Sequence, residues 1–109
     1  MWMVDPRILC RQHLLGEHVE IHMFIGAFNR EKSVEGYLQK GLLEVHNLAS
    51  RHNELVEEMK RRGYQHHSEV EEKWNHSSEV GFIDRKRNLK ELINRCSRCK
   101  RRYLELQTR

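Results

Sequence analysis

The chain has 109 residues, the size of one domain, with 38% hydrophobic residues, 33% charged residues and a formal net charge of +4. Its longest uninterrupted apolar stretch, residues 23–28, is far shorter than the about twenty residues that cross a bilayer, which excludes a membrane-spanning protein. The odd number of cysteines, three, and the absence of a signal-peptide pattern indicate reduced thiols and an intracellular, cytoplasmic setting.

The first part of the chain predicts a long helix over residues 6–28. Asp5 followed by Pro6 is typical of a helix start, because Asp caps the free N–H groups and Pro fits the first turn. A connection follows over residues 29–41, with a short helical piece around residues 34–39. The pattern therefore places one long helix at the beginning of the domain.

Two further helices are predicted, over residues 42–62 and 83–106. Apolar residues recur at helical spacing in both, and Gly63 is a favourable stop signal after the first of them. The segment between them, residues 66–80, is polar and reads as a loop. We therefore expect an all-α fold of three helices in a single domain that covers residues 1–109.

A row of polar residues follows the first predicted helix. At 100° per residue, His13, Glu17, Glu20 and Phe24 fall within about 60° of one another, beside an apolar row. Two carboxylates and a histidine on one face are common on solvated helices. The same grouping can also serve acid–base chemistry.

Two segments carry a resemblance to a known family. Residues 12–20 read Gln-His-Leu-Leu-Gly-Glu-His-Val-Glu and are followed by Gly26-Ala27; this resembles the first helix of the phage pyrimidine-dimer DNA glycosylases. Residues 51–64, with Arg51 and Glu54 and a Lys-Arg-Arg-Gly-Tyr end, are similar to the second long helix of that family. The two matches occur in the family's order and cover about a third of the chain.

The resemblance implies an all-helical DNA-repair enzyme. Members of the family cut the N-glycosidic bond of a damaged pyrimidine and then nick the abasic strand by β-elimination, with the N-terminal α-amine as nucleophile. It implies that Glu20 is the catalytic carboxylate and that His13 lies in the site. Because Trp2 is bulky and initiator methionine is usually kept before a large residue, the expected nucleophile is the amine of Met1. An α-amine has a pKa of about 8, so a useful fraction is neutral at pH 7.

The basic charge is concentrated in the third predicted helix. Residues 84–109 contain ten Lys or Arg and three acidic residues, which indicates a polyanionic partner, nucleic acid first. The resemblance implies that this partner is double-stranded DNA with damaged or abasic sites. Val19 stands where the family has an arginine, so DNA contacts on the first helix are expected to be reduced or moved. The expected DNA-binding residues are Arg11, Arg30, Arg95, Arg98, Arg101 and Arg102. We expect a monomer that needs no cofactor.

The spacings Cys10-x-x-His13 and Cys96-x-x-Cys99 permit a zinc site with two ligands from each of two helices. However, Cys96 and Cys99 fall on the apolar stripe of their helix, where buried free thiols are ordinary, and members of the resembled family need no metal. We therefore expect core thiols and no metal site. Two alternatives to the enzyme remain open at this point: a non-catalytic nucleic-acid-binding module on the same scaffold, and a zinc-dependent interaction protein.

Overall fold

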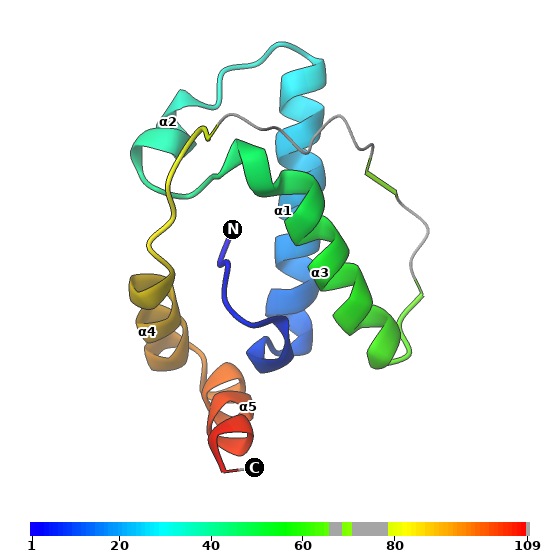
Figure 1. Ribbon diagram of the computed structural model, residues 1–109, viewed down its shortest axis with the longest axis vertical. Helices are drawn as coiled ribbons and strands as arrows, with labels where there is room; N and C mark the ends of the chain where they lie inside the picture. The colour runs from blue at the N-terminus through cyan, green and yellow to red at the C-terminus, as the bar shows by residue number, and fades with distance from the viewer. Residues whose placement is uncertain (66–68, 71–78, 109) are drawn as a thin grey trace.

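The computed structural model describes residues 1–65, 69–70 and 79–108, and within them the fold is all-α (Figure 1). The predicted all-α class is confirmed, but the prediction of three helices is wrong, because the described residues form five. None of them is long and apolar enough to span a bilayer. The helices are α1 (Arg11–Asn29), α2 (Glu35–Gln39), α3 (Leu48–Arg61), α4 (Arg85–Arg95) and α5 (Ser97–Gln107), with short 3-10 turns η1 (Pro6–Ile8) and η2 (Val45–Asn47).

The first predicted helix is divided into η1 and α1. Asp5 does cap a turn, since its side chain accepts a hydrogen bond of 3.0 Å from the Arg7 N–H, but that turn is η1. Leu9 and Cys10 are extended and end it. The carbonyl of Leu9 accepts a hydrogen bond of 2.7 Å from Arg62 at the end of α3, so tertiary contacts replace the helical ones. The long helix therefore begins at Arg11.

The second predicted helix begins later than expected. Leu42 and Glu44 bind groups from other parts of the chain: the Leu42 carbonyl accepts from the N-terminal amine, and Glu44 accepts a hydrogen bond of 2.8 Å from the Ile83 N–H. Residues 42–44 therefore lie outside any helix, and α3 follows η2. Its predicted end is confirmed, with Gly63 at a φ of +82°.

The third predicted helix is interrupted at Cys96, whose φ of −121° and ψ of 110° are extended. Asp84 caps α4 by accepting a hydrogen bond of 3.0 Å from the Arg87 N–H. The Cys96 thiol accepts from the Cys99 N–H across 3.5 Å and so caps α5. The break lets α5 turn back towards η1, against which it packs.

The core lies between α1 and α3 and is closed by α4 and α5 (Figure 1). The first residues of the chain run between α1 and α4, and the hydrogen bonds described below join them to both. The predicted short helix near residues 34–39 is confirmed as α2. Most of the predicted polar loop, residues 66–80, lies outside the described residues. The fully buried apolar side chains include Leu9, Leu14, Ile21, Phe24, Leu43, Leu48, Leu55, Ile83 and Leu92.

Candidate active site

The N-terminal amine lies at the centre of the molecule. It donates a hydrogen bond to the Glu20 carboxylate on α1 and a second one, of 3.1 Å, to the Leu42 carbonyl. The Met1 side chain is buried, and the side-chain amide of Asn88 on α4 donates to the carbonyls of Met1 and Trp2 at 3.2 and 3.1 Å. Three separate segments therefore fix the amine against one carboxylate.

A pocket of about 240 Å³ opens onto this pair. The Glu20 side chain is 35% exposed, so the carboxylate reaches solvent although the Met1 side chain does not. A larger cavity of about 510 Å³ lies beside α4, α5 and η1, but neither Met1 nor Glu20 lines it. The smaller pocket is therefore the one that can present an amine and a carboxylate to a ligand. It is lined by Met1, Trp2, Glu20, Leu42, Arg87, Asn88, Glu91 and Arg95.

The predicted row of polar residues on α1 does not form one face. Glu17 is buried and accepts two hydrogen bonds from Arg51 on α3, at 2.7 and 2.9 Å, whereas Glu20 faces the pocket. Phe24 is fully buried. Glu17 lies about 60° from Glu20 around the helix, towards the apolar row, and this rotation is enough to place it in the core. The alternative of a solvated face is therefore wrong for Glu17.

His13 lies next to Trp2 and to two thiols. Its ring meets the Trp2 ring edge to face at 5.8 Å, and its Nδ1 lies 3.1 Å from the Cys10 sulfur and 3.6 Å from the Cys99 sulfur. Burial lowers the pKa of His13, and the charge of Arg95 lowers it further. The imidazole is therefore largely neutral at pH 7.

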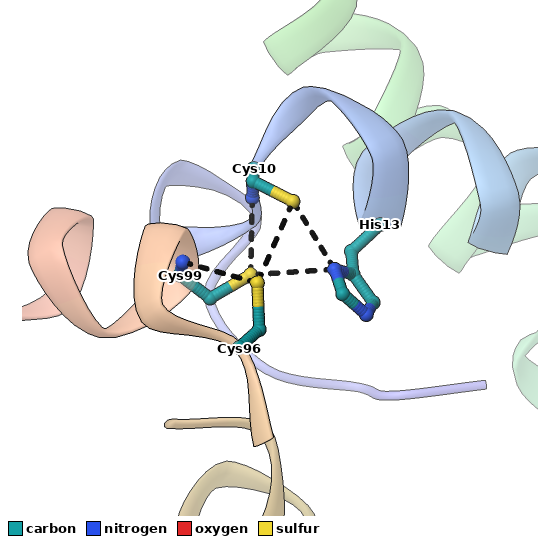
Figure 2. Close-up of side chains that lie close together, drawn as sticks. All are labelled: Cys10, His13, Cys96 and Cys99. Atoms are coloured by element: carbon teal, nitrogen blue, oxygen red, sulfur yellow. Dashed lines mark hydrogen bonds between the residues drawn. The ribbon is translucent and has the colours of Figure 1, made fainter. Parts of the chain in front are cut away.

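The cysteines set aside as core thiols converge with that histidine. Cys10, His13, Cys96 and Cys99 place one ligand-type atom each within 4.8 Å of all the others (Figure 2). Burial raises the pKa of the Cys99 thiol to about 12. For Cys96, burial acts in the same direction but hydrogen bonds from the N–H groups of Cys99 and Arg98 outweigh it and lower the pKa.

A second group of imidazoles lies deeper between α1 and α3. The rings of His18, His22 and His52 pack with centroids 4.7 to 4.9 Å apart. His18 and His52 are buried. Sequence reasoning missed that His22 joins them, although its spacing of four residues from His18 places it on the same face of α1.

The predicted DNA-binding arginines separate into distinct environments. Arg95 lines the pocket and lies over the Trp2 ring at 5.7 Å. Arg98 and Arg101 are exposed on α5, whereas Arg102 is partly buried and donates a hydrogen bond of 2.8 Å to the Arg7 carbonyl.

Arg11 and Arg30 lie at opposite ends of α1, a helix of 19 residues. At a rise of 1.5 Å per residue they are about 28 Å apart, so they cannot contact the same phosphate group. Arg11 stacks over the Tyr64 ring at 4.7 Å. The pocket arginine that sequence reasoning missed is Arg87. Its spacing of eight residues from Arg95 was the available signal, because positions 87, 91 and 95 share one face of a helix.

Comparison with known proteins identifies the family of the chain. The family model described as pyrimidine dimer DNA glycosylase matches residues 1–72, about two thirds of the chain. The matched range contains Met1, Glu20 and the buried pair of Glu17 with Arg51. No curated protein and no solved structure matches the chain. The chain belongs to the pyrimidine dimer DNA glycosylase family.

Proposed function

We propose that this protein is a DNA glycosylase with abasic-site lyase activity that acts on damaged pyrimidines in double-stranded DNA. The nucleophile is the α-amine of Met1, and Glu20 is the catalytic carboxylate. The observation that carries the proposal is the direct hydrogen bond between these two groups at the wall of a pocket. The family match supports the choice of a damaged pyrimidine as the substrate.

The first step is excision of the base. The neutral amine attacks C1′ of the damaged nucleotide and forms a C–N bond while the glycosidic bond breaks. The base leaves with its electron pair and takes a proton from water. Positive charge develops on the sugar as the base departs, and the Glu20 carboxylate stabilises it, as carboxylates do in glycoside hydrolysis. The same carboxylate accepts the proton that the amine loses.

The second step is cleavage of the strand. The sugar ring opens as O4′ gains a proton, which leaves an imine between C1′ and the Met1 nitrogen. Removal of a C2′ proton then expels the 3′ phosphate by β-elimination. Water hydrolyses the remaining imine and restores the amine. Glu20 is the titratable group in hydrogen-bond contact with this nitrogen, so we assign it the proton transfers.

The rest of the pocket holds the DNA. Arg87 and Arg95 bring two guanidinium groups to the rim and suit the phosphates that flank an extruded nucleotide. Trp2 offers an aromatic face beside the reacting carbon, and His13 supports that ring from its edge. His13 is therefore a positioning residue in this proposal. The amine, the carboxylate and the cations together favour an enzyme over a binding module.

Borohydride trapping on a duplex with a single abasic site tests the proposal. Reduction of the imine should join the protein covalently to DNA, and mass spectrometry of the digested adduct should place the link on residue 1. The intact mass of the purified protein establishes that Met1 carries a free amine. A variant with one added N-terminal residue is the matched control: it displaces the amine from Glu20 and should give far less adduct.

Two results would contradict the proposal. An adduct on a lysine side chain would move the nucleophile away from Met1. Tight binding to abasic DNA with no adduct at all would leave a non-catalytic nucleic-acid-binding module as the function.

A further inference from the structure

All three cysteines of the chain meet one histidine where the first turn of α1 meets the first turn of α5. Cys10 and His13 come from the start of α1, and Cys96 and Cys99 come from the start of α5, more than eighty residues away (Figure 2). The Cys10 and Cys96 sulfurs lie 3.9 Å apart, and the His13 Nδ1 lies 3.1 Å from Cys10 and 3.6 Å from Cys99.

We propose that Cys10, His13, Cys96 and Cys99 bind one zinc ion in a structural site. Zinc in proteins takes four tetrahedral ligands, with Zn–S of about 2.3 Å and Zn–N of about 2.0 Å, which puts neighbouring sulfurs about 3.8 Å apart and sulfur and nitrogen about 3.6 Å apart. The Cys10–Cys96 separation of 3.9 Å and the His13–Cys99 separation of 3.6 Å match these edges, and the His13–Cys10 separation of 3.1 Å is about 0.5 Å shorter. Three soft thiolates with one imidazole favour zinc over hard cations such as magnesium or calcium.

The backbone explains how the two pairs converge. Cys10 is the N-cap of α1 and His13 is the third residue of that helix; Cys96 is the N-cap of α5 and Cys99 is its third residue. Each pair therefore lies on one side of the first turn of its helix. The extended conformations of Cys10 and Cys96, which interrupt the two predicted long helices, are what bring the two first turns face to face.

Hydrogen bonds to sulfur support a metal site over ordinary core packing. The Cys99 sulfur accepts from the Cys10 N–H at 3.2 Å, and the Cys96 sulfur accepts from the Cys99 N–H at 3.5 Å. N–H donors of this kind stabilise thiolates, the form that binds metal, and a bound cation deprotonates its thiol ligands outright. His13 directs its Nδ1 atom towards two sulfurs. Core packing alone would not require a nitrogen there, because an apolar side chain would fill the same space.

The site would do two things for the protein. Four protein ligands leave no open position, so the ion is structural and joins α5 to the start of α1 in a domain with a small core. It also borders the active site, since His13 contacts Trp2 and Cys96 follows Arg95, which lines the pocket. Zinc would therefore hold both Trp2 and Arg95 in position without touching the substrate.

Metal analysis of the full chain tests the proposal. Protein purified without a metal-affinity column should contain about one zinc ion per chain, retained through desalting. Replacement of zinc by cobalt should produce the intense visible absorption of a tetrahedral thiolate site. The variant Cys99→Ser should lose most of the zinc. Ser97→Ala is the matched control, because Ser97 lies between the two cysteines, is exposed, and should leave the zinc content unchanged.

Two further measurements keep the test valid if Cys99→Ser fails to fold, or if the zinc binds at another group of residues. In the wild-type protein, a strong chelator should expose three reactive thiols and lower the melting temperature, and added zinc should reverse both effects. The variant His18→Gln removes one member of the three-histidine group and should retain zinc. The proposal is wrong if wild-type protein incubated with zinc and desalted holds none while its thiols stay reactive. It is also wrong if a disulfide joins two of the cysteines, or if His18→Gln abolishes zinc binding while Cys99→Ser preserves it.

Discussion

Arg51 of α3 donates two hydrogen bonds to the carboxylate of Glu17 on α1, from Nε to Oε2 at 2.7 Å and from Nη2 to Oε1 at 2.9 Å. Both side chains are buried, and Arg51 makes a third hydrogen bond, of 3.2 Å, to the half-exposed Glu54. This pair joins the two long helices. One turn further along α1, Glu20 has a different role, because its partner is the N-terminal amine at the pocket.

Glu17→Gln should lower stability and spare catalysis. Removal of one partner from a buried ion pair costs about 3 kcal/mol, because the remaining charge has no full replacement for the lost contacts. Urea unfolding measures the loss, and base excision per folded molecule should stay near the wild-type rate. Glu54→Gln is the matched control and should cost under about 1 kcal/mol, since Glu54 is half exposed. A fully stable Glu17→Gln protein without activity would contradict this division of roles.

Glu44 should make the protein sensitive to acid. Burial raises the pKa of Glu44, but hydrogen bonds from Arg85, Asn47 and the Ile83 N–H outweigh burial and hold that pKa below its usual value. A carboxyl whose pKa is depressed on folding contributes stability above its unfolded pKa of about 4.3 and loses it as pH falls through the folded value.

Stability curves between pH 7 and pH 3 should therefore show a decline below about pH 4.3 that Glu44→Gln reduces. The variant should also be less stable than wild type at pH 7. Glu105→Gln, a change at an exposed residue of α5, should leave the curve unaltered. Equal acid sensitivity of wild type and Glu44→Gln would show that other carboxyls govern the decline.

Gly81 should tolerate no side chain. Its φ is +92°, and a Cβ built there would lie 2.1 Å from the carbonyl oxygen of Leu43. Leu43 follows Leu42, whose carbonyl accepts a hydrogen bond from the N-terminal amine. Gly81→Ala should therefore destabilise the protein by about 3 kcal/mol or more. Gly16→Ala, inside α1 with open space around the new methyl group, should stabilise it by about 1 kcal/mol. Thermal unfolding measures the stability change of each variant. An unchanged stability of Gly81→Ala would mean that the backbone at Gly81 does not pack on Leu43.

Arg87 and Arg95 should carry the DNA contacts that matter for chemistry. Each neutralised phosphate contact changes the slope of log affinity against log salt concentration by about 0.9. Arg87→Ala and Arg95→Ala should each flatten that slope and slow base excision, because both residues line the pocket. Arg98→Ala and Arg101→Ala, on α5, should leave the rate of base excision unchanged and alter only the affinity for DNA. Full excision rates in both pocket variants would mean that DNA approaches from another side.

Much of the fold followed from local pattern, and the exceptions share a cause. The all-α class, α2 and the stop at Gly63 were predictable because apolar spacing and a glycine act locally. The helix breaks at Cys10 and Cys96 were not, since neither position carries a proline or glycine. Both breaks depend on partners from distant segments: Arg62 donates to the carbonyls before Cys10, and the thiols of the two breaks meet each other.

The site also combines features that the sequence could predict with features that depend on contacts between distant segments. The resemblance brought Met1 and Glu20 to attention, and the structure places them in contact. The burial of Glu17 was not predictable, because a rotation of about 60° around a helix decides between pocket and core and only the packing of α3 fixes it. The convergence of Cys10 with Cys96 depends on the path of the whole chain, so the two spacings could suggest it but not establish it.

The most direct test of the central claim is single-turnover base excision from a duplex that contains a pyrimidine dimer, compared between wild type, Glu20→Gln and Glu91→Gln. Glu91→Gln is the matched control, because Glu91 lines the same pocket and pairs with Arg95, not with the amine. Glu20→Gln should bind the duplex at least as tightly as wild type and excise the base at least about 100-fold more slowly, the scale of a lost acid–base group. Glu91→Gln should stay within about threefold of the wild-type rate. This is a change in activation free energy of less than about 1.36 kcal/mol, which would alter the rate about tenfold. Equal excision rates for Glu20→Gln and wild type would contradict the assignment of Glu20 as the catalytic carboxylate.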